Sequence, residues 1–426
     1  MKRKFSIILL VLLVMTIAVS SLSTSASVTN KTISLMGIIH SDGADRTSWI
    51  TSAALNIQGV RNTSVSTFKG FTSSEVLSQF NNQDMVVIHT HGSQSSLLAY
   101  KDDSSTLVTT QMIDLPFAAD AFSQLRICFV GACSCGAGGS SAVNVVNTIY
   151  DQGALCVIGY QNSVTTSRNR HMLQQFCYYI GCGYSVANAL TKAQQDVFNT
   201  YGDFGGVDNR LVRGISAIAM TDSSYKTIGI STYSLKDYSC QSVNLSSNDV
   251  IFADEFNVCN RIGDMYSFNE KGEIYSYTKL ILDDKKSSTL SFDSTTFFNS
   301  FNLEGYKLEV TQYSQSVLNC MRAYINDLKT NDIIYYTTDT NGDLLSYGYP
   351  RAGAAKEVQK EFSDITIDKI INYVNQYYNI YDIEDIIIDV ADINNPIADI
   401  SYKTITDGYE CIETLNIPLS KFKLIN

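Results

Sequence analysis

A histidine and a cysteine each end an apolar run in this chain of 426 residues. His91 closes the stretch "MVVIHTH" and Cys133 closes the stretch "LRICFVGAC", and small residues that let a peptide backbone approach follow both. A thiol beside an imidazole can be held as a reactive thiolate, while the imidazole protonates a departing amine. The two residues therefore predict thiol chemistry at a site where an imidazole and a thiol face each other.

The elements that must position this pair are predicted from the apolar pattern. Short apolar runs predict strands, and amphipathic patterns predict helices with Ser73 or Ser74 as one N-cap and an interruption around 181–183. The strands are expected at 33–39, 84–91, 125–133 and 154–160, and the helices at 47–58, 73–82, 142–153 and 168–200. Near-continuous apolar strands separated by helices predict an α/β fold with a mostly parallel sheet covered on both faces. Because chemistry in such sheets collects at the carboxyl ends of the strands, we expect His91 and Cys133 to face each other there.

The remaining segments complete this first domain and predict a second one. In the first, 96–110 predicts a hairpin turning at 102–105, 109–122 a helix broken near residue 116, and 214–222 the last strand. After Tyr225, polar residues and period-2 alternation increase, which predicts a smaller α+β domain at 226–426. Its hairpins are expected at 263–282 and 331–350, its helices at 314–328 and 367–378, and its closing strands at 383–392 and 408–419.

The two blocks around His91 and Cys133 resemble the signature of the caspase-like (clan CD) cysteine peptidases. In that family an apolar block ending in His-Gly precedes one ending in Ala-Cys. The stretches "HGSQSSLLAYKDDSSTLVTTQMIDL", "GALCVIGYQNSV" and "GYSVANALTKAQ" are similar to further parts of its CHAT-type members, and clostripain and gingipain are related. The resemblance covers 33–222 and implies a caspase-like α/β/α sandwich acting as a cysteine endopeptidase on protein or peptide substrates, without a cofactor.

The resemblance also implies the roles of individual residues. Cys133 would be the nucleophile and His91 the general acid, and the backbone N–H groups of Gly92 and Cys133 would bind the oxyanion. The family's substrate pocket is partly lined by the segment after the strand that follows the cysteine. This implies pocket positions for Tyr160, Gln161 and Asn162.

Two further pocket candidates come from neighbouring loops. His40 ends the first predicted strand, and Asp102 lies in the predicted hairpin after His91. The segment after Tyr160 contains no carboxylate, which argues against specificity for arginine, and its basic residues are Arg168 and Arg170. The residue preference at the cleavage site is therefore left open.

The first 26 residues predict a secretory signal peptide. Three cations precede an apolar run from Phe5 to Val19, and Thr24 and Ala26 suit the positions before a cleavage site. An uncleaved membrane anchor is the alternative. We expect a secreted, extracellular and bacterial protein that meets the membrane only during export. The net charge of −11 makes nucleic acid a poor partner.

Other interpretations of the same residues remain open. Cys135 is a rival nucleophile, and His89 is expected to support the strand rather than react. The histidine pair and the cysteine pair together offer four zinc ligands, so a zinc-binding extracellular protein is one alternative, although no metal is expected. A catalytically silent caspase-like binding scaffold is the other. Cys240 and Cys259 are candidates for a disulfide across a loop, whereas Cys128, Cys156 and Cys177 are expected in the core.

Overall fold

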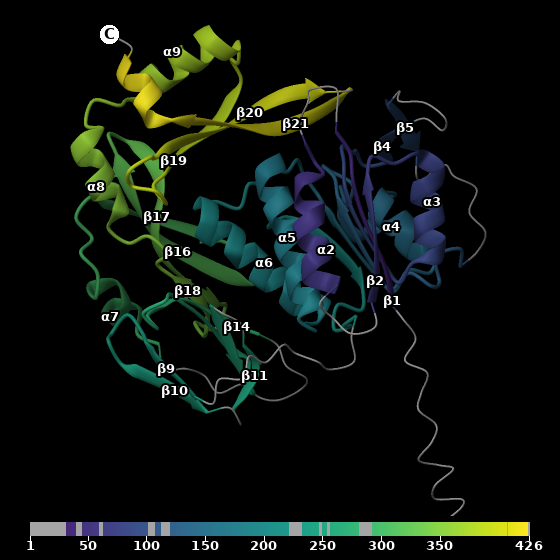
Figure 1. Cartoon of the computed structure of the whole chain (residues 1–426), viewed down its shortest axis with the longest axis horizontal. Helices are drawn as coiled ribbons and strands as arrows, with labels where there is room; N and C mark the ends of the chain where they lie inside the picture. The colour runs from purple at the N-terminus through teal and green to yellow at the C-terminus, as the bar shows by residue number, and fades with distance from the viewer. Residues whose placement is uncertain are drawn as a thin grey trace, which may run out of the picture.

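The computed structural model describes most of the chain after residue 30. The described ranges are 31–39, 45–58, 63–100, 107–111, 120–220, 232–246, 249–253, 256–280, 292–406 and 408–424, so the predicted signal peptide lies outside them. Two bodies of secondary structure lie side by side (Figure 1). Within the described ranges, no helix has the length and apolar character needed to cross a bilayer.

A six-stranded sheet forms the centre of the first body. Its order is β2-β1-β3-β6-β7-β8. The bounds are Lys31–Gly37 for β1, Thr63–Lys69 for β2, Met85–His89 for β3, Ile127–Gly131 for β6, Cys156–Tyr160 for β7 and Arg210–Gly214 for β8. All neighbouring pairs are parallel except β7 with β8. The mostly parallel sheet confirms the predicted α/β class.

Helices cover both faces of this sheet (Figure 1). One face carries α2 (Ser48–Gln58), α5 (Thr166–Gly181) and α6 (Val186–Tyr201), and the other carries α3 (Ser73–Asn82) and α4 (Val145–Asp151). Because alternate strand residues point to opposite faces, two separate apolar clusters fill the layers. Trp49 and Phe176 belong to the first cluster and Phe80 and Val146 to the second. The three-layer arrangement is the predicted one.

Three local predictions for the first body are wrong. The N-cap of α3 is Thr72, whose side chain accepts a hydrogen bond from the backbone of Glu75 in a capping box. The last strand is β8 and ends at Gly214, because the chain turns away after this glycine, where φ is 86°. Residues 109–111 are not helical, because they belong to β5 (Leu107–Gln111), which pairs with β4 (Ser96–Tyr100). Residues 112–119 lie outside the described ranges.

The second body is built on an eleven-stranded sheet. Its strands are β11 (Val250–Ala253), β12 (Asn257–Asn260), β13 (Asp264–Phe268), β14 (Ile274–Lys279), β15 (Tyr306–Gln312), β16 (Ser316–Ile325), β17 (Leu328–Asp339), β18 (Leu344–Gly348), β19 (Ile383–Asp389), β20 (Ile397–Thr406) and β21 (Tyr409–Pro418). A separate ribbon pairs β9 (Thr232–Lys236) with β10 (Ser242–Ser246), and the helices are α7 (Ser294–Asn299), α8 (Ala354–Glu361) and α9 (Ile367–Tyr378).

Most of the second body follows the sequence prediction. The hairpins at 263–282 and 331–350 and the helix at 367–378 are confirmed. The helix expected at 314–328 is wrong, because this segment is β16, which pairs with β15 and with β17. Burial of Leu318, Cys320 and Arg322 on the same side of the strand shows the period of two.

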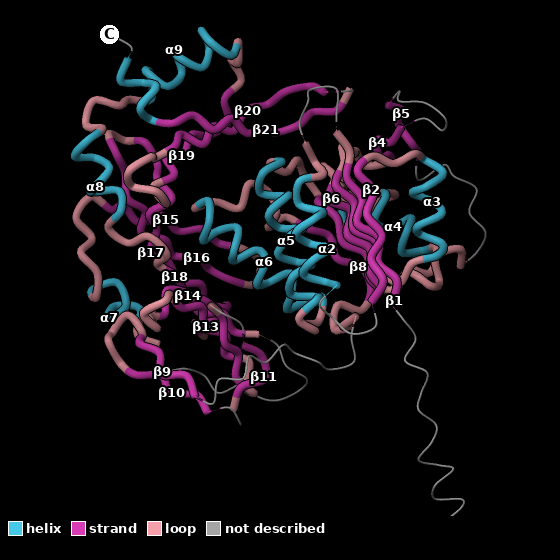
Figure 2. Tube along the Cα trace, viewed as in Figure 1, coloured by secondary structure: helices cyan, strands magenta, loops and turns pink. Residues whose placement is uncertain are grey.

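The hairpin formed by β20 and β21 leaves the second sheet and reaches over the first body (Figures 1 and 2). Its register runs from Ile397 opposite Pro418 to Thr406 opposite Tyr409, so two residues join the strands. Strand β21 packs against α5, and its first residues lie close to the carboxyl ends of β3 and β6. The hairpin therefore belongs to the second sheet but covers the edge where the predicted catalytic residues lie.

Candidate active site

The structure brings His91 and Cys133 to one edge of the first sheet. Strands β3 and β6 are parallel neighbours, with His89 opposite Gly131, so each of the two residues stands two positions beyond this pair. A Cβ atom added to Gly92 would lie 2.8 Å from the Cβ atom of Ala132, so the two loops touch with no space for a larger residue. Thr90 donates a backbone hydrogen bond to the carbonyl of Gly131 across the same junction, at 3.4 Å.

Cys133 lies in a tight turn beneath the hairpin. Its thiol is 7% exposed, and the backbone N–H of Val164 donates to its Sγ atom at 3.4 Å. The next residue, Ser134, has a φ of 55°, a left-handed value that sharpens the turn after β6. Burial raises the pKa of the Cys133 thiol, so the thiol is protonated in this closed arrangement.

Cys135 points the other way. It is fully buried in the cluster between the sheet and helices α3 and α4, whereas Cys133 belongs to the cluster on the opposite face. Its Sγ atom lies 3.4 Å from the carbonyl oxygen of Val130, and burial raises its pKa to about 12. Because the two thiols are on opposite faces, they do not converge on one zinc ion, and Cys135 does not approach the cleft.

The two histidines are both buried but differ in their surroundings. His91 is 2% exposed, and burial, with a further contribution from the charge of Arg46, lowers its pKa to about 2. His89 is the last residue of β3, and burial lowers its pKa well below the ordinary value. In the described part of the chain, the Nδ1 atom of His89 has no hydrogen-bond partner. His89 thus stays inside the sheet, and His91 faces the loop junction.

The tip of the hairpin covers His91 directly. The Sγ atom of Cys411, on β21, lies 2.9 Å from Nδ1 of His91 and 3.5 Å from Nε2. The ring of Tyr409 stacks on the imidazole with 6.0 Å between centroids, and its hydroxyl lies 3.0 Å from Oγ of Ser96. A cysteine of the second body therefore occupies the position facing the imidazole.

The hairpin is also fixed to the start of α5. Ile412 pairs with Thr165 in a parallel bridge, and the hydroxyls of Ser167 and Thr414 lie 2.9 Å apart. Further from the hairpin tip, Arg168 donates to Asp399 at 2.6 Å and also pairs with Asp203 at 2.8 Å. The first turn of α5 is thus occupied by polar contacts that reach from residue 399 to residue 414.

A buried ion pair anchors the same hairpin beside Cys133. The guanidinium of Arg46 donates to the carboxylate of Glu413, and the side chains are only 2% and 10% exposed. The hydroxyl of Thr166 donates to the same carboxylate at 3.0 Å. Arg46 lies between β1 and α2, where its N–H donates to the carbonyl of Ile38 and its own carbonyl accepts from the indole of Trp49. Its position is therefore set by the first body.

The predicted pocket residues are placed as follows. Tyr160 is fully buried in the core, and its hydroxyl donates to Asn169 at 2.9 Å. Gln161 is half-buried and donates to the side chain of Asn209 at 3.0 Å, and Asn162 is exposed. His40 and Asp102 lie outside the described residues. The structure thus keeps Tyr160 within the packed layers and leaves Asn162 open to solvent.

The two arginines noted in the sequence are engaged elsewhere. Arg168 lies between Asp203 and Asp399, and Arg170 donates to the hydroxyl of Ser48 at 3.3 Å. The cation beside Cys133 is instead Arg46, which the sequence interpretation missed together with Cys411 and Glu413. The signal for Arg46 was its place in the loop after the first strand, because such loops meet at the carboxyl edge of a parallel sheet.

One group of side chains has the composition of a metal site. His91, Cys411 and Glu413 offer donor atoms within 4.8 Å of one another. The carboxylate is already bonded to the guanidinium of Arg46 and to the hydroxyl of Thr166. Because this buried positive charge opposes a second cation, we assign no metal to the group. All ten cysteines are free thiols, so the candidate pairing of Cys240 with Cys259 is absent.

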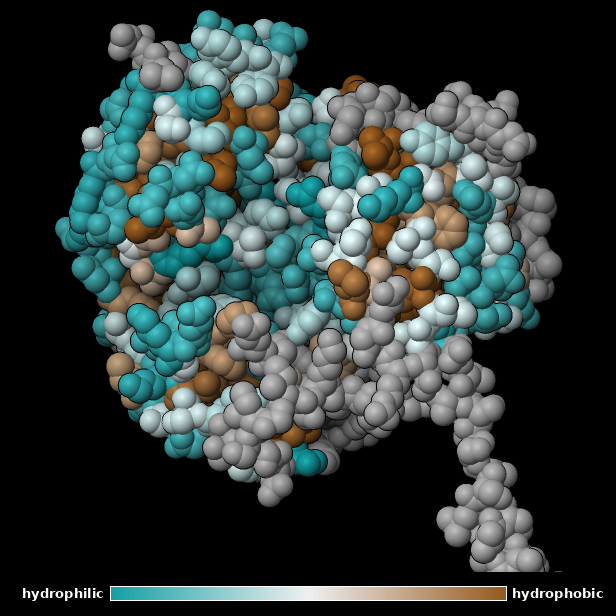
Figure 3. All heavy atoms as spheres, viewed as in Figure 1, coloured by the Kyte–Doolittle hydropathy of each residue, from teal (hydrophilic) through white to brown (hydrophobic). Residues whose placement is uncertain are grey.

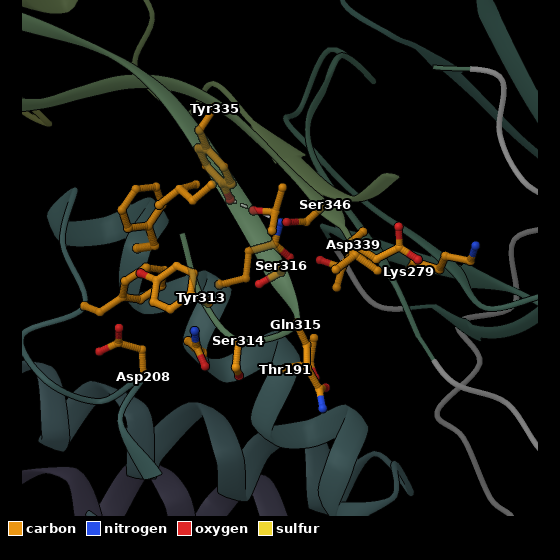
Figure 4. Close-up of a pocket in the computed structure, with 18 of the residues that line it drawn as sticks. Thr191, Asp208, Lys279, Tyr313, Ser314, Gln315, Ser316, Tyr335, Asp339 and Ser346 are labelled. Atoms are coloured by element: carbon orange, nitrogen blue, oxygen red, sulfur yellow. Dashed lines mark hydrogen bonds between the residues drawn. The ribbon is translucent and has the colours of Figure 1, made fainter. Parts of the chain in front are cut away.

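A cavity of about 550 Å³ lies away from this site, between α6 and strands β16 to β18 (Figure 4). Its lining includes Thr191, Asp208, Tyr313 and Tyr335 but neither histidine nor cysteine. On the face shown in Figure 3, the surface between the two bodies is hollowed and lined mainly by hydrophilic residues. His91 and Cys133 are instead at the covered edge of the first sheet.

Comparison with known proteins gives a family match within the first body. Residues 42–214 match the family model of the CHAT domain, which confirms the predicted resemblance for this segment. No curated protein matches the chain.

Three solved structures are similar at low identity. The complex of Porphyromonas gingivalis RgpB pro- and mature domains has 10% identity and a TM-score of 0.34, covering 73% of this chain and 68% of that chain. The separase–securin complex of Saccharomyces cerevisiae has 12% identity and a TM-score of 0.28, covering 44% and 12%. The C-terminal domain of Bacillus megaterium YpeB has 11% identity and a TM-score of 0.17, covering 38% and 84%. All three TM-scores are below 0.5, and the family match is confined to residues 42–214.

Proposed function

Starting from the CHAT domain of residues 42–214, we propose that this chain is a bacterial, exported cysteine endopeptidase with Cys133 as nucleophile and His91 as general acid. The contact of the His91–Gly92 loop with the Ala132–Cys133 loop at the carboxyl edge of the sheet is the observation that supports this best. The loops that carry both residue types needed for thiol chemistry adjoin there, at the edge where parallel sheets hold their ligands.

The proposed reaction proceeds through an acyl-enzyme. His91 first takes the proton of the Cys133 thiol. The resulting thiolate attacks the carbonyl carbon of the peptide bond, and the C–N bond breaks as His91 passes this proton to the leaving amine. Water then hydrolyses the thioester and restores the thiol. In the described part of the chain, the backbone N–H groups of Gly92 and Cys133 donate to no other residue, which leaves them available for the oxyanion. Each such donor lowers the barrier by about 3 kcal/mol.

The form described here is latent under this proposal. The hairpin tip places Cys411 against His91, covers Cys133 to 7% exposure and leaves its thiol with a raised pKa. A buried neutral thiol is a poor nucleophile, and a peptide has no route to it. Activity therefore requires the β20–β21 hairpin to leave the first body.

Peptidyl acyloxymethyl ketone probes with different side chains test this proposal on the full chain. The Glu413→Gln variant, which weakens the hairpin anchor, is labelled beside its Cys133→Ala and Cys135→Ala derivatives. We expect labelling that is lost with Cys133→Ala and kept with Cys135→Ala. Labelling that depends on Cys135 contradicts the assigned nucleophile. No labelling by any probe, with the hairpin shown to be open, contradicts an enzyme and favours the silent binding scaffold.

A further inference from the structure

The carboxylate of Glu413 is held in a place that the first body prepares for it. The backbone of Arg46 is held within the first body, by the carbonyl of Ile38 and the indole of Trp49. These two contacts do not involve the hairpin, so when the hairpin leaves, the backbone of Arg46 keeps its place and the guanidinium loses the carboxylate of Glu413. An arginine in a shielded position strongly favours a carboxylate partner, because the planar donor pair fits two oxygens.

A second donor lines the same place. The hydroxyl of Thr166 donates to Glu413 at 3.0 Å, and Thr166 is the first residue of α5. The N-terminal turn of a helix carries partial positive charge, so α5 adds to the attraction for an anion. The surroundings of Glu413 thus combine a full positive charge, a hydroxyl donor and a helix start.

This place adjoins the proposed nucleophile. Val164 contacts the Sγ atom of Cys133, Thr165 pairs with Ile412 of the hairpin, and Thr166 bonds to Glu413. Three consecutive residues therefore connect the nucleophile to the carboxylate. Burial has the larger effect on the pKa values of Cys133 and His91, and the charge of Arg46 acts on both. At His91 it adds to the lowering by burial, and at Cys133 it opposes the raising by burial.

We propose that Arg46 and Thr166 form a substrate subsite for an acidic side chain close to the scissile bond, and that Glu413 occupies this subsite in the closed chain. The inference rests on the proposed function and names its substrate class. A glutamate or aspartate of the substrate replaces Glu413 on the guanidinium. A basic side chain is repelled there, and a neutral one leaves the arginine without a carboxylate.

The test uses the full chain with Glu413→Gln, in which the hairpin is held less tightly and the subsite is exposed more often. Cleavage sites in a proteome-derived peptide library are mapped by mass spectrometry, and kcat/KM is then measured on matched peptides that carry Glu or Gln at the enriched position. We expect enrichment of Asp and Glu at one position beside the bond and a preference for the Glu peptide of roughly tenfold to a hundredfold.

Second-site variants show whether Arg46 is responsible. Arg46→Gln should bring the Glu-to-Gln ratio close to one while the Gln peptide is still cleaved, and Arg46→Lys should restore part of the preference. Arg170→Gln, which removes a neighbouring cation, is the matched control and should keep the ratio. An acidic preference that survives Arg46→Gln overturns the inference.

The failures of the two proposals are distinguishable. Efficient cleavage with no enrichment of acidic residues overturns the acidic subsite and leaves the endopeptidase standing. Loss of cleavage of both peptides in Arg46→Gln, with no rescue by Arg46→Lys, means that Arg46 supports the fold and overturns its role in specificity. No cleavage of any library peptide by the Glu413→Gln chain, with the hairpin shown to be open, overturns the proposed function itself.

Discussion

Replacing Glu413 by glutamine should open the site. The change keeps the shape of the side chain but leaves the buried guanidinium of Arg46 opposite a neutral amide. The two side chains are 10% and 2% exposed, so solvent does little to compensate the charge. Breaking a buried ion pair by removing one partner costs about 3–5 kcal/mol, and we take about 3 because the amide still accepts hydrogen bonds.

This cost sets the size of the expected effect. If the hairpin detaches as a unit, about 3 kcal/mol raises the open fraction on the order of 100-fold, since each 1.4 kcal/mol is about tenfold. When the hairpin recloses faster than the reagent reacts, the alkylation rate of Cys133 is proportional to this open fraction. The exposed thiol of Cys240 provides an internal reference in the same sample, because it reacts whether or not the hairpin is bound.

Glu384→Gln is the matched control for this experiment. It makes the same chemical change in the ion pair of Glu384 with Lys403, whose side chains are 39% and 38% exposed. Exposed pairs contribute little, so the Cys133 labelling rate should stay close to that of the unmodified chain. Equal labelling rates in Glu413→Gln and Glu384→Gln would refute the reasoning that the buried pair holds the hairpin.

Three further outcomes are expected. Burial holds the pKa of His91 at about 2 in the closed state, against an ordinary 6.5. The open state therefore binds a proton more readily, and the closed state loses stability as pH falls below 6.5. Burial raises the pKa of Asp399 to about 6 in the closed state, so protonation of Asp399 has the opposite effect below pH 6. Labelling relative to the reference thiol should therefore rise between about pH 7 and pH 6, and a flat profile identical to that of His91→Gln contradicts this. Gly92→Ala should lower kcat/KM more than about tenfold in the opened chain. The new Cβ atom would lie 2.8 Å from that of Ala132 and force the two loops apart. An unchanged kcat/KM argues against the assigned oxyanion donors. Thr72→Ala should destabilise the first body by about 1 kcal/mol through loss of the α3 cap, measured by urea unfolding, with no change in peptide preference.

The parts of the site that the sequence predicted are those defined by local patterns. His91 and Cys133 each end an apolar run, and the parallel pairing of neighbouring strands was enough to bring them to one edge. Because His91 and Cys133 are the last residues of these apolar runs, the sequence also implied that they stand at the ends of β3 and β6. The opposite orientations of Cys133 and Cys135 were not, because they follow from the left-handed turn at Ser134.

The hairpin contacts depended on pairings distant in the chain. Residues 408–419 were predicted as a strand, but nothing in that pattern indicates that Cys411 meets His91 or that Glu413 meets Arg46. Such contacts depend on how two sheets are placed relative to each other, which alternation and capping signals do not encode. The β16 error has the same origin, because strands on both sides outweighed a weak helical pattern.

The hairpin and the catalytic edge belong to one polypeptide, and this makes the occupancy of the site independent of protein concentration. A tethered segment acts at an effective concentration that commonly reaches the millimolar range, so even a modest intrinsic affinity keeps it bound. Dilution alone therefore never uncovers this edge of the sheet. A single cut between the first sheet and β20 would change the same contacts into a bimolecular complex, which separates on dilution. After such a cut, opening of the site would be effectively irreversible in dilute solution.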